Sequence, residues 1–116
     1  MGPVQLFFNP HCSKARSARS LLDERGVDYE LVEYLKNPPS RDQIEHLLAI
    51  LEDPPEKLVR KDNRFKELGL DPSDYNDRGA IAALLVEHPE LMERPVVVVG
   101  DRAVIGRPPE RVLELL

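Results

Sequence analysis

The chain has 116 residues and a formal net charge of −5, with 16 Lys and Arg against 21 Asp and Glu. This length is enough for one domain, residues 1–116, with a core that needs no disulfide, and a single cysteine excludes an intrachain disulfide. The negative charge disfavours a nucleic-acid binder, and the absence of Trp beside three Phe and three Tyr disfavours an aromatic platform for single strands.

No apolar run approaches the length of a membrane span, and the N-terminus lacks a signal-peptide pattern. We therefore expect a soluble, cytoplasmic protein that binds no membrane, and we expect it to be a monomer. Clusters of His, Cys and carboxylate residues with metal-ligand spacing are also missing from the sequence, so no metal site is expected.

The first third of the chain predicts a strand, a helix and a second strand. The apolar run Val4 to Phe8 indicates a short buried strand. Apolar residues then recur at helical spacing from Ser13 to Arg25, and Gly26 is a natural C-terminal stop. The partly alternating segment Tyr29 to Tyr34 indicates the second strand. A strand, helix and strand at this spacing form a βαβ unit, in which the two strands are parallel.

The middle of the chain predicts helices. Ser40 begins a capping-box signature at the start of one helix, and the Pro-Pro pair at 54–55 follows its end. Within the polar stretch that follows, short helical segments are expected at about residues 56–59 and 64–68. Asp77 is expected to cap another helix, because its carboxylate can accept hydrogen bonds from the first free amides.

The last third predicts two strands and a helix. Val96 to Val99 is a continuous apolar run, typical of a strand covered on both faces. Gly100-Asp101 forms a tight turn into a return strand at 103–105. A last amphipathic helix is expected to bury Val112, Leu113 and Leu116. This order predicts an α/β, thioredoxin-like fold with a four-stranded mixed sheet and a helical insertion at about residues 40–90.

Cys12 stands at the start of the first predicted helix, after an Asn9-Pro10 turn. Helix N-terminal amides and the helix dipole stabilise a thiolate, and can lower a cysteine pKa from about 8.5 to about 3.5–7.5. A buried structural cysteine is the alternative. The placement of Cys12 after a turn, beside Lys14 and one turn before Arg16, favours a reactive thiol.

The arginines indicate an anion site. Eleven of the 16 basic residues are arginine, which suits bidentate recognition of oxyanions. In a thioredoxin-like sheet the first helix begins near the loop before the third strand, so Cys12 should face the Arg94-Pro95 peptide, a candidate cis bond. Arg107 should lie just beyond the fourth strand. Together these groups would hold a tetrahedral oxyanion, although each arginine taken alone could equally be a solvated surface residue.

Five motifs occur in order along the chain: Asn9-Pro10-x-Cys12-x-x-x-Arg16, Tyr34-Leu35-x-Asn37-Pro38-Pro39-Ser40-Arg41, Leu58-Val59-Arg60-Lys61, Arg94-Pro95-Val96-Val97 and Gly106-Arg107-Pro108. In these motifs the chain resembles the glutaredoxin-coupled arsenate reductase (ArsC) family, and its length is that of the shorter members.

The resemblance implies that Cys12 attacks arsenate, while Arg60, Arg94 and Arg107 bind the oxyanion and stabilise a covalent arseno-thiol intermediate. It further implies that glutathione attacks this adduct as co-substrate and that glutaredoxin reduces the resulting mixed disulfide, as in arsenic detoxification, with no bound cofactor. One cysteine agrees with an external reductant, because the chain has no resolving thiol. The supporting residues would be Asn9, Pro10, Ser13, Arg16 and Pro95.

One position departs from the family pattern. Family members often carry a histidine four positions before the cysteine, and this chain has Phe8 there. Activation of Cys12 is therefore expected to rest on the helix terminus and the arginines, with His11 as a further candidate partner.

Two other functions remain open at this point. A cysteine-dependent phosphatase needs an arginine six positions after the cysteine, where this chain has Ala18. Regulators of this fold that bind RNA polymerase usually carry Cys-x-x-Cys when they are redox-controlled, and this chain has Ala15 at the second position. A non-catalytic regulator or interaction protein of the polymerase-binding type, without redox control, therefore stays open as the alternative. The three arginines favour the enzyme, since a regulator would not need them all.

Overall fold

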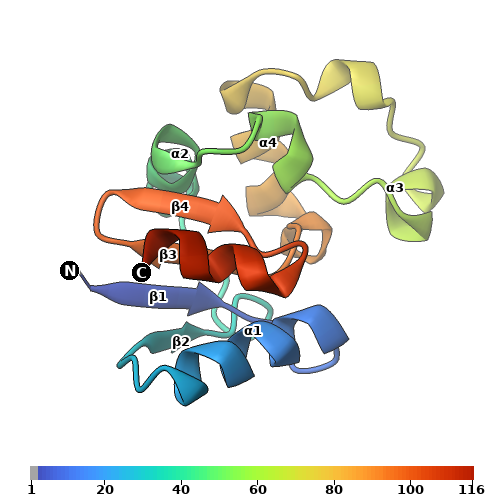
Figure 1. Ribbon diagram of the computed structural model, residues 1–116. Coiled ribbons are helices and arrows are strands. Elements are labelled where there is room, and N and C mark those ends of the chain that lie inside the picture. Colours follow the sequence, from blue (N-terminus) through green and yellow to red (C-terminus); the bar gives the residue numbers. More distant parts are fainter. Residues whose placement is uncertain (1–2) are drawn as a thin grey trace.

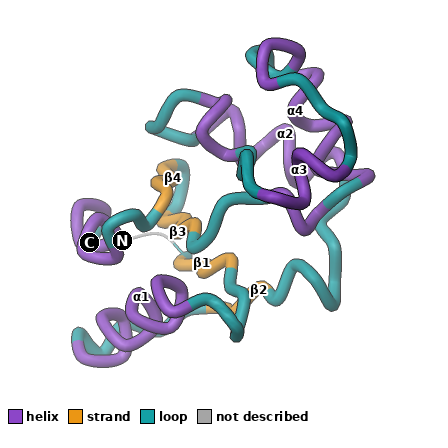
Figure 2. The backbone as a smooth tube through the Cα atoms, turned by 90° about the vertical axis from the view of Figure 1, so that its right-hand side faces the viewer, coloured by secondary structure: helices purple, strands orange, loops and turns teal. Residues whose placement is uncertain are grey.

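The computed structural model describes residues 3–116 (Figures 1 and 2). Its strands are β1 (Val4–Phe7), β2 (Glu30–Val32), β3 (Val96–Val99) and β4 (Arg102–Ile105). Its α-helices are α1 (Ser13–Glu24), α2 (Arg41–Ile50), α3 (Asn63–Glu67) and α4 (Arg78–Glu87). Four 3-10 helices complete the chain: η1 (Pro55–Leu58), η2 (Pro72–Asp74), η3 (Pro89–Leu91) and η4 (Pro109–Leu115).

The strands form one mixed sheet in the order β2-β1-β3-β4. β1 and β2 are parallel, whereas β3 is antiparallel to both β1 and β4. The helices from α2 to η3 are inserted between β2 and β3. The predicted α/β, thioredoxin-like plan, with its parallel first pair and its helical insertion, is therefore confirmed.

Helices cover both faces of the sheet. Successive side chains of a strand point to opposite faces, so each strand contributes residues to two apolar clusters. Leu6 and Val97 pack with α1 and η4 in one apolar cluster. Phe7 and Val98 belong to a second cluster, formed with α2 and α4. Figure 2 shows the resulting layers, with α1 on one side of the strands and α2 and α4 on the other.

The helix starts follow the predicted caps. The Ser40 side chain accepts a hydrogen bond from the Gln43 amide at 3.2 Å, and the Gln43 side chain accepts one from the Ser40 amide at 2.8 Å, which completes the capping box of α2. Asp77 accepts from the Ala80 amide at 2.9 Å at the start of α4. These side chains satisfy amides that have no partner within the helix.

The predicted last helix differs from the structure in type and in its buried face. Residues 109–115 form the 3-10 helix η4, in which three residues make one turn. This spacing buries Val112 and Leu115, while Leu113 is partly buried and Leu116 is 38% exposed. The prediction that Leu116 is buried is wrong, because it assumed the wider turn of an α-helix.

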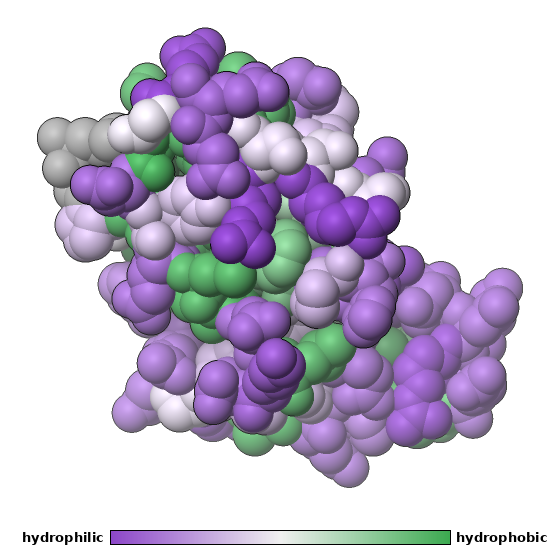
Figure 3. All heavy atoms as spheres, turned by 90° about the horizontal axis from the view of Figure 1, so that it is seen from below, coloured by the Kyte–Doolittle hydropathy of each residue, from purple (hydrophilic) through white to green (hydrophobic). Residues whose placement is uncertain are grey.

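The surface of the described residues is mainly polar. Figure 3 shows mostly hydrophilic side chains on the face seen from below, with a few apolar patches between them. Leu35, Val86 and Leu116 are the exposed large hydrophobic residues of the described chain. Among residues 3–116, none of the helices has the length and apolar character needed to cross a membrane.

Gly106 allows the end of β4 to approach the loop before β3. Its amide donates to the Pro95 carbonyl at 2.8 Å, and a Cβ at this position would lie 2.8 Å from Pro95 Cγ and 3.1 Å from Val112 Cγ1. We expect Gly106→Ala to lower the free energy of unfolding by about 1–3 kcal/mol through overpacking, measured by urea denaturation.

Gly79→Ala is the matched control for this substitution. Gly79 is exposed in the first turn of α4, where a Cβ would meet only the Asp77 carboxylate at 3.3 Å. The free energy of unfolding of this variant should stay within about 1 kcal/mol of the wild-type value. Equal urea midpoints for Gly106→Ala and the wild type would contradict the close packing described at Pro95.

Candidate active site

A short turn presents Cys12 at the beginning of α1. Asn9 is buried, its side-chain oxygen accepts from the His11 amide at 2.9 Å, and its carbonyl accepts from the Cys12 amide at 3.1 Å. Cys12 itself is the N-cap residue of α1, with an extended backbone. The predicted turn therefore directs the thiol toward the free amides of the first helical turn.

The other supporting residues of this segment hold the turn. Arg16 donates through Nη1 to the Pro10 carbonyl at 2.9 Å, and its amide donates to the Cys12 carbonyl at 3.1 Å. Ser13 is exposed as the first residue of α1. Arg16 thus bonds to the backbone of the turn, whereas the guanidinium groups beside the thiol come from the other end of the chain.

The thiol of Cys12 is half-buried and electrostatically activated. Its partial burial raises the pKa, but hydrogen bonds from the Ala15 amide, the Arg94 side chain and the Lys14 amide, together with the Arg94 charge, outweigh this effect. The pKa of Cys12 is therefore lowered from its ordinary value. Amides at a helix N-terminus and a neighbouring guanidinium both favour the anionic form of a thiol.

Arg94 and Arg107 lie next to Cys12, as the topology predicts. Arg107 Nη2 is 3.7 Å from Cys12 Sγ, and Arg107 Nε donates to the Arg94 carbonyl at 2.8 Å. The Arg94-Pro95 peptide bond is cis, as is the bond between Arg107 and Pro108, and Pro95 is buried. Two loops that lie far from Cys12 in the sequence thus bring arginines to its thiol.

Glu93 connects Arg60 to this cluster. Its Oε1 accepts from Arg60 Nη1 at 3.1 Å and from the Arg94 amide at 3.2 Å, and lies 3.0 Å from Arg107 Nε. Arg60 also donates through Nε to Asp62 at 3.3 Å. Arg107 therefore contacts Cys12 directly and Arg94 acts on the pKa of the thiol, while Arg60 is joined to Arg107 through a shared carboxylate.

Phe8 and His11 add no hydrogen bond to the thiol. Phe8 is buried in the cluster under α1, and the Arg19 guanidinium lies over its ring at 5.5 Å from the centroid. The His11 side chain is exposed, and among the described residues its ring makes no hydrogen bond to Cys12. The side-chain hydrogen bonds to Cys12 come from arginine.

Sequence reasoning missed two residues of the site, Glu93 and Tyr34. Glu93 directly precedes the Arg94-Pro95 motif, and Tyr34 opens the second motif, but neither position carries a pattern that indicates a contact with Cys12. Tyr34 is fully buried, with its hydroxyl near the Arg94 guanidinium. An acidic residue beside a predicted anion site is the one signal that could have suggested Glu93.

A hollow of about 380 Å³ borders the arginine cluster. Glu93 and Arg107 line it together with Lys57, Lys61 and Arg111. Arg111 is paired with Asp53, and the Lys61 amine donates to two backbone carbonyls. The approach to the site on this side is therefore rich in cationic groups.

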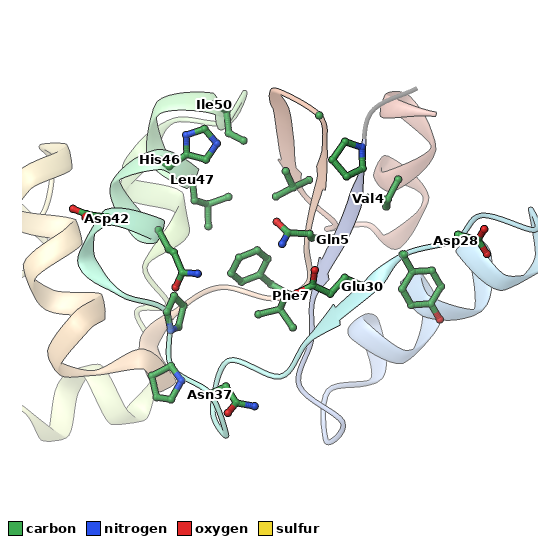
Figure 4. Close-up of a pocket in the computed structure, with 18 residues that line it drawn as sticks. Val4, Gln5, Phe7, Asp28, Glu30, Asn37, Asp42, His46, Leu47 and Ile50 are labelled. Carbon is green, nitrogen blue, oxygen red and sulfur yellow. The ribbon is translucent and has the colours of Figure 1, made fainter.

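A wider groove of about 1020 Å³ lies elsewhere, between α2 and the pair β1 and β2 (Figure 4). Figure 4 shows His46 and Leu47 of α2 across from Gln5 and Phe7 of β1. Cys12 does not line this groove. Within residues 3–116, His, Cys, Asp and Glu side chains do not gather in a group of three or more that could hold a metal ion.

Comparison with known proteins identifies the family of this chain. The model of the ArsC family matches residues 7–115. The chain belongs to the ArsC family. It is 43% identical over 115 residues to the uncharacterized protein YfgD of Escherichia coli K12, covering 97% of this chain and 96% of that protein. It is 39% identical over 118 residues to an arsenate reductase of Neisseria meningitidis, covering the whole of both chains.

Solved structures of similar proteins share the fold of this ArsC-family chain. The arsenate reductase from Vibrio cholerae superposes with a TM-score of 0.87 at 36% identity, covering 99% of this chain and 98% of that one. A putative arsenate reductase from Yersinia pestis gives a TM-score of 0.84 at 38% identity, covering 96% of this chain and 98% of that one.

The charges around Cys12 predict how its reactivity depends on pH. The thiolate is the nucleophile, so the rate of alkylation by iodoacetamide should reach half its maximum at a pH below about 8.5, the pKa of a free cysteine. Arg94→Gln removes a positive charge and a donor, and should move this midpoint to higher pH. Glu93→Gln removes a negative charge and should move it to lower pH.

Arg102→Gln is the matched control for Arg94→Gln. Arg102 begins β4 and pairs with the exposed Glu52 at 2.9 Å, outside the cluster around Cys12. Its removal should leave the alkylation midpoint unchanged. If Arg94→Gln leaves the alkylation midpoint unchanged, or if Arg102→Gln shifts it by the same amount, a specific effect of Arg94 on the thiolate is contradicted.

Proposed function

We propose that this protein reduces arsenate to arsenite, with Cys12 as the nucleophile. The observation that carries the proposal is a thiol whose Sγ lies 3.7 Å from Arg107 Nη2 and whose pKa is lowered, in part by Arg94. The name of the Neisseria meningitidis relative, arsenate reductase, supports the same activity. A thiolate beside convergent cations fits attack on a tetrahedral oxyanion.

In the first step the arginines make an otherwise repulsive encounter favourable. A thiolate and a dianionic arsenate repel each other, and the guanidinium groups of Arg94 and Arg107 offset this repulsion while they orient the acceptor. The sulfur forms a bond to arsenic, one arsenic–oxygen bond breaks, and that oxygen takes up a proton and leaves as water. The product is an arseno-thiol adduct on Cys12.

In the second step an external thiol supplies the remaining electrons. Glutathione attacks the adduct, and the two sulfurs become a mixed disulfide on Cys12 while arsenic(V) becomes arsenic(III) and leaves as arsenite. Glutaredoxin then reduces the mixed disulfide and restores the thiol. We expect this cycle to run in the cytoplasm, where thiols are kept reduced.

The single cysteine supports an external reductant and disfavours a dithiol switch. Ala15 occupies the place of the second cysteine in a Cys-x-x-Cys motif, and it is fully buried on the inner face of α1. A second thiol at this position would not be accessible without rearrangement of the cluster. The site therefore favours the enzyme over a redox-controlled regulator that binds RNA polymerase.

A coupled assay tests the proposed function. With glutathione, glutaredoxin and glutathione reductase present, arsenate should cause consumption of NADPH by the wild-type protein. Cys12→Ser should abolish it because the nucleophile is lost. Arg60→Ala should lower kcat/KM for arsenate by about 100-fold if Arg60 contributes a donor to the oxyanion, the effect typical of one such donor.

Arg64→Ala is the control for Arg60→Ala. Arg64 pairs with Glu90 at 3.0 Å on an exposed part of the surface, away from Glu93 and Cys12. Its removal should leave kcat/KM for arsenate unchanged. Arsenate-dependent NADPH consumption that stays at the level without enzyme, under all these reductants, would overturn the assignment to arsenate.

A further inference from the structure

Two buried polar atoms at the site lack a hydrogen-bond partner. Among the buried side-chain nitrogen and oxygen atoms of residues 3–116, the hydroxyl of Tyr34 and Nε of Arg94 are the two without a partner. Tyr34 is fully buried, two residues after the end of β2. An unpaired buried polar group costs about 1–3 kcal/mol, so most proteins contain few of them.

Arg94 links the two unpaired atoms to Cys12, because its charge acts on both Tyr34 and the thiol. The Tyr34 hydroxyl is close enough to Arg94, Arg60 and Cys12 for their charges to act on it. Arg94 acts on the pKa of Cys12 as well. Arg94 thus acts on both the thiol and the Tyr34 hydroxyl, yet neither the hydroxyl nor Arg94 Nε has a hydrogen-bond partner that meets the geometric criteria.

The chemistry of these groups defines the class of ligand. Nε of an arginine is a donor only, and a tyrosine hydroxyl is a donor with some capacity to accept. Burial raises the pKa of Tyr34; the Arg94 and Arg60 charges act in the opposite direction but do not cancel this rise. The hydroxyl is therefore protonated at neutral pH. The Tyr34 hydroxyl and Arg94 Nε are two donors that lack an acceptor, and they fit a ligand with oxygen lone pairs and negative charge.

We propose that the Tyr34 hydroxyl, together with Nε of Arg94, donates a hydrogen bond to an oxygen of the oxyanion at Cys12. This inference rests on the proposed function and adds a substrate-contacting residue to it. In the absence of an oxyanion the two donors are unpaired, and the bound oxyanion supplies the acceptor that they lack. Tyr34 then helps to orient the tetrahedral substrate.

A merely structural role for Tyr34 makes a different prediction. The ring packs in the apolar cluster with α2 and α4, and a phenylalanine ring would fill the same space. If the hydroxyl served the fold, its removal would destabilise the free protein. If it serves the ligand, its removal should leave the free protein equally stable or more stable, because an unpaired buried group disappears.

The experiment compares Tyr34→Phe with the wild type in two measurements. Thermal unfolding with increasing arsenate, without glutathione, reports the affinity through the rise in Tm. We expect the apparent Kd for arsenate to increase about tenfold, the usual effect of losing a hydrogen bond to a charged group. Urea unfolding without arsenate should give a midpoint that is not lower than that of the wild type.

Tyr29→Phe is the matched control and should show the reverse pattern. The Tyr29 hydroxyl donates to Asp23 at 2.8 Å and accepts from Arg19 at 3.1 Å on the outer side of α1. Its loss should reduce the urea midpoint slightly and leave the arsenate affinity unchanged. The two tyrosines thus separate a hydroxyl that serves the fold from one that serves the ligand.

Each result decides one question. An arsenate affinity of Tyr34→Phe equal to that of the wild type overturns the inference about Tyr34, and so does a urea midpoint that falls as it does in Tyr29→Phe. A wild-type Tm that does not respond to arsenate overturns the proposed function itself, before any variant is compared.

Discussion

One carboxylate, that of Glu93, holds the arginines of the site together. Guanidinium groups repel one another, and a negative charge between them reduces this repulsion. Glu93 accepts from Arg60 and from the Arg94 amide, and lies 3.0 Å from Arg107. This arrangement holds the guanidinium groups of Arg60 and Arg107 and the backbone of Arg94, so the proposed oxyanion would meet donors that are already oriented.

The sheet brings these groups to a single edge. β1 and β4 run in the same direction and β3 runs in the opposite one, so the end of β1, the start of β3 and the end of β4 lie together. Cys12 follows β1, Glu93 and Arg94 precede β3, and Arg107 follows β4. The second strand ends at the same edge, because it is parallel to β1, and Tyr34 follows it.

Much of this could be predicted from the sequence, and the exceptions have physical reasons. Local patterns predicted the strands and caps, and the topology predicted that Cys12 meets Arg94 and Arg107. The contact of Glu93 with Arg60 spans 33 positions and depends on side-chain geometry that no periodicity encodes. The unpaired Tyr34 hydroxyl is visible only in three dimensions. The prediction of which face of the last helix is buried was wrong, because periodicity alone did not distinguish a 3-10 turn from an α-helical one.

The amides that make Cys12 a nucleophile have a consequence at the end of the proposed cycle. The Ala15 and Lys14 amides and the Arg94 guanidinium stabilise the anionic sulfur and give nothing comparable to a neutral disulfide. A thiol with a lowered pKa is also a good leaving group, and stabilising the reduced form makes the disulfide more oxidising. The start of α1 therefore favours release of Cys12 from the disulfide as well as formation of the attacking thiolate. An incoming thiol meets a bond that the protein itself has weakened.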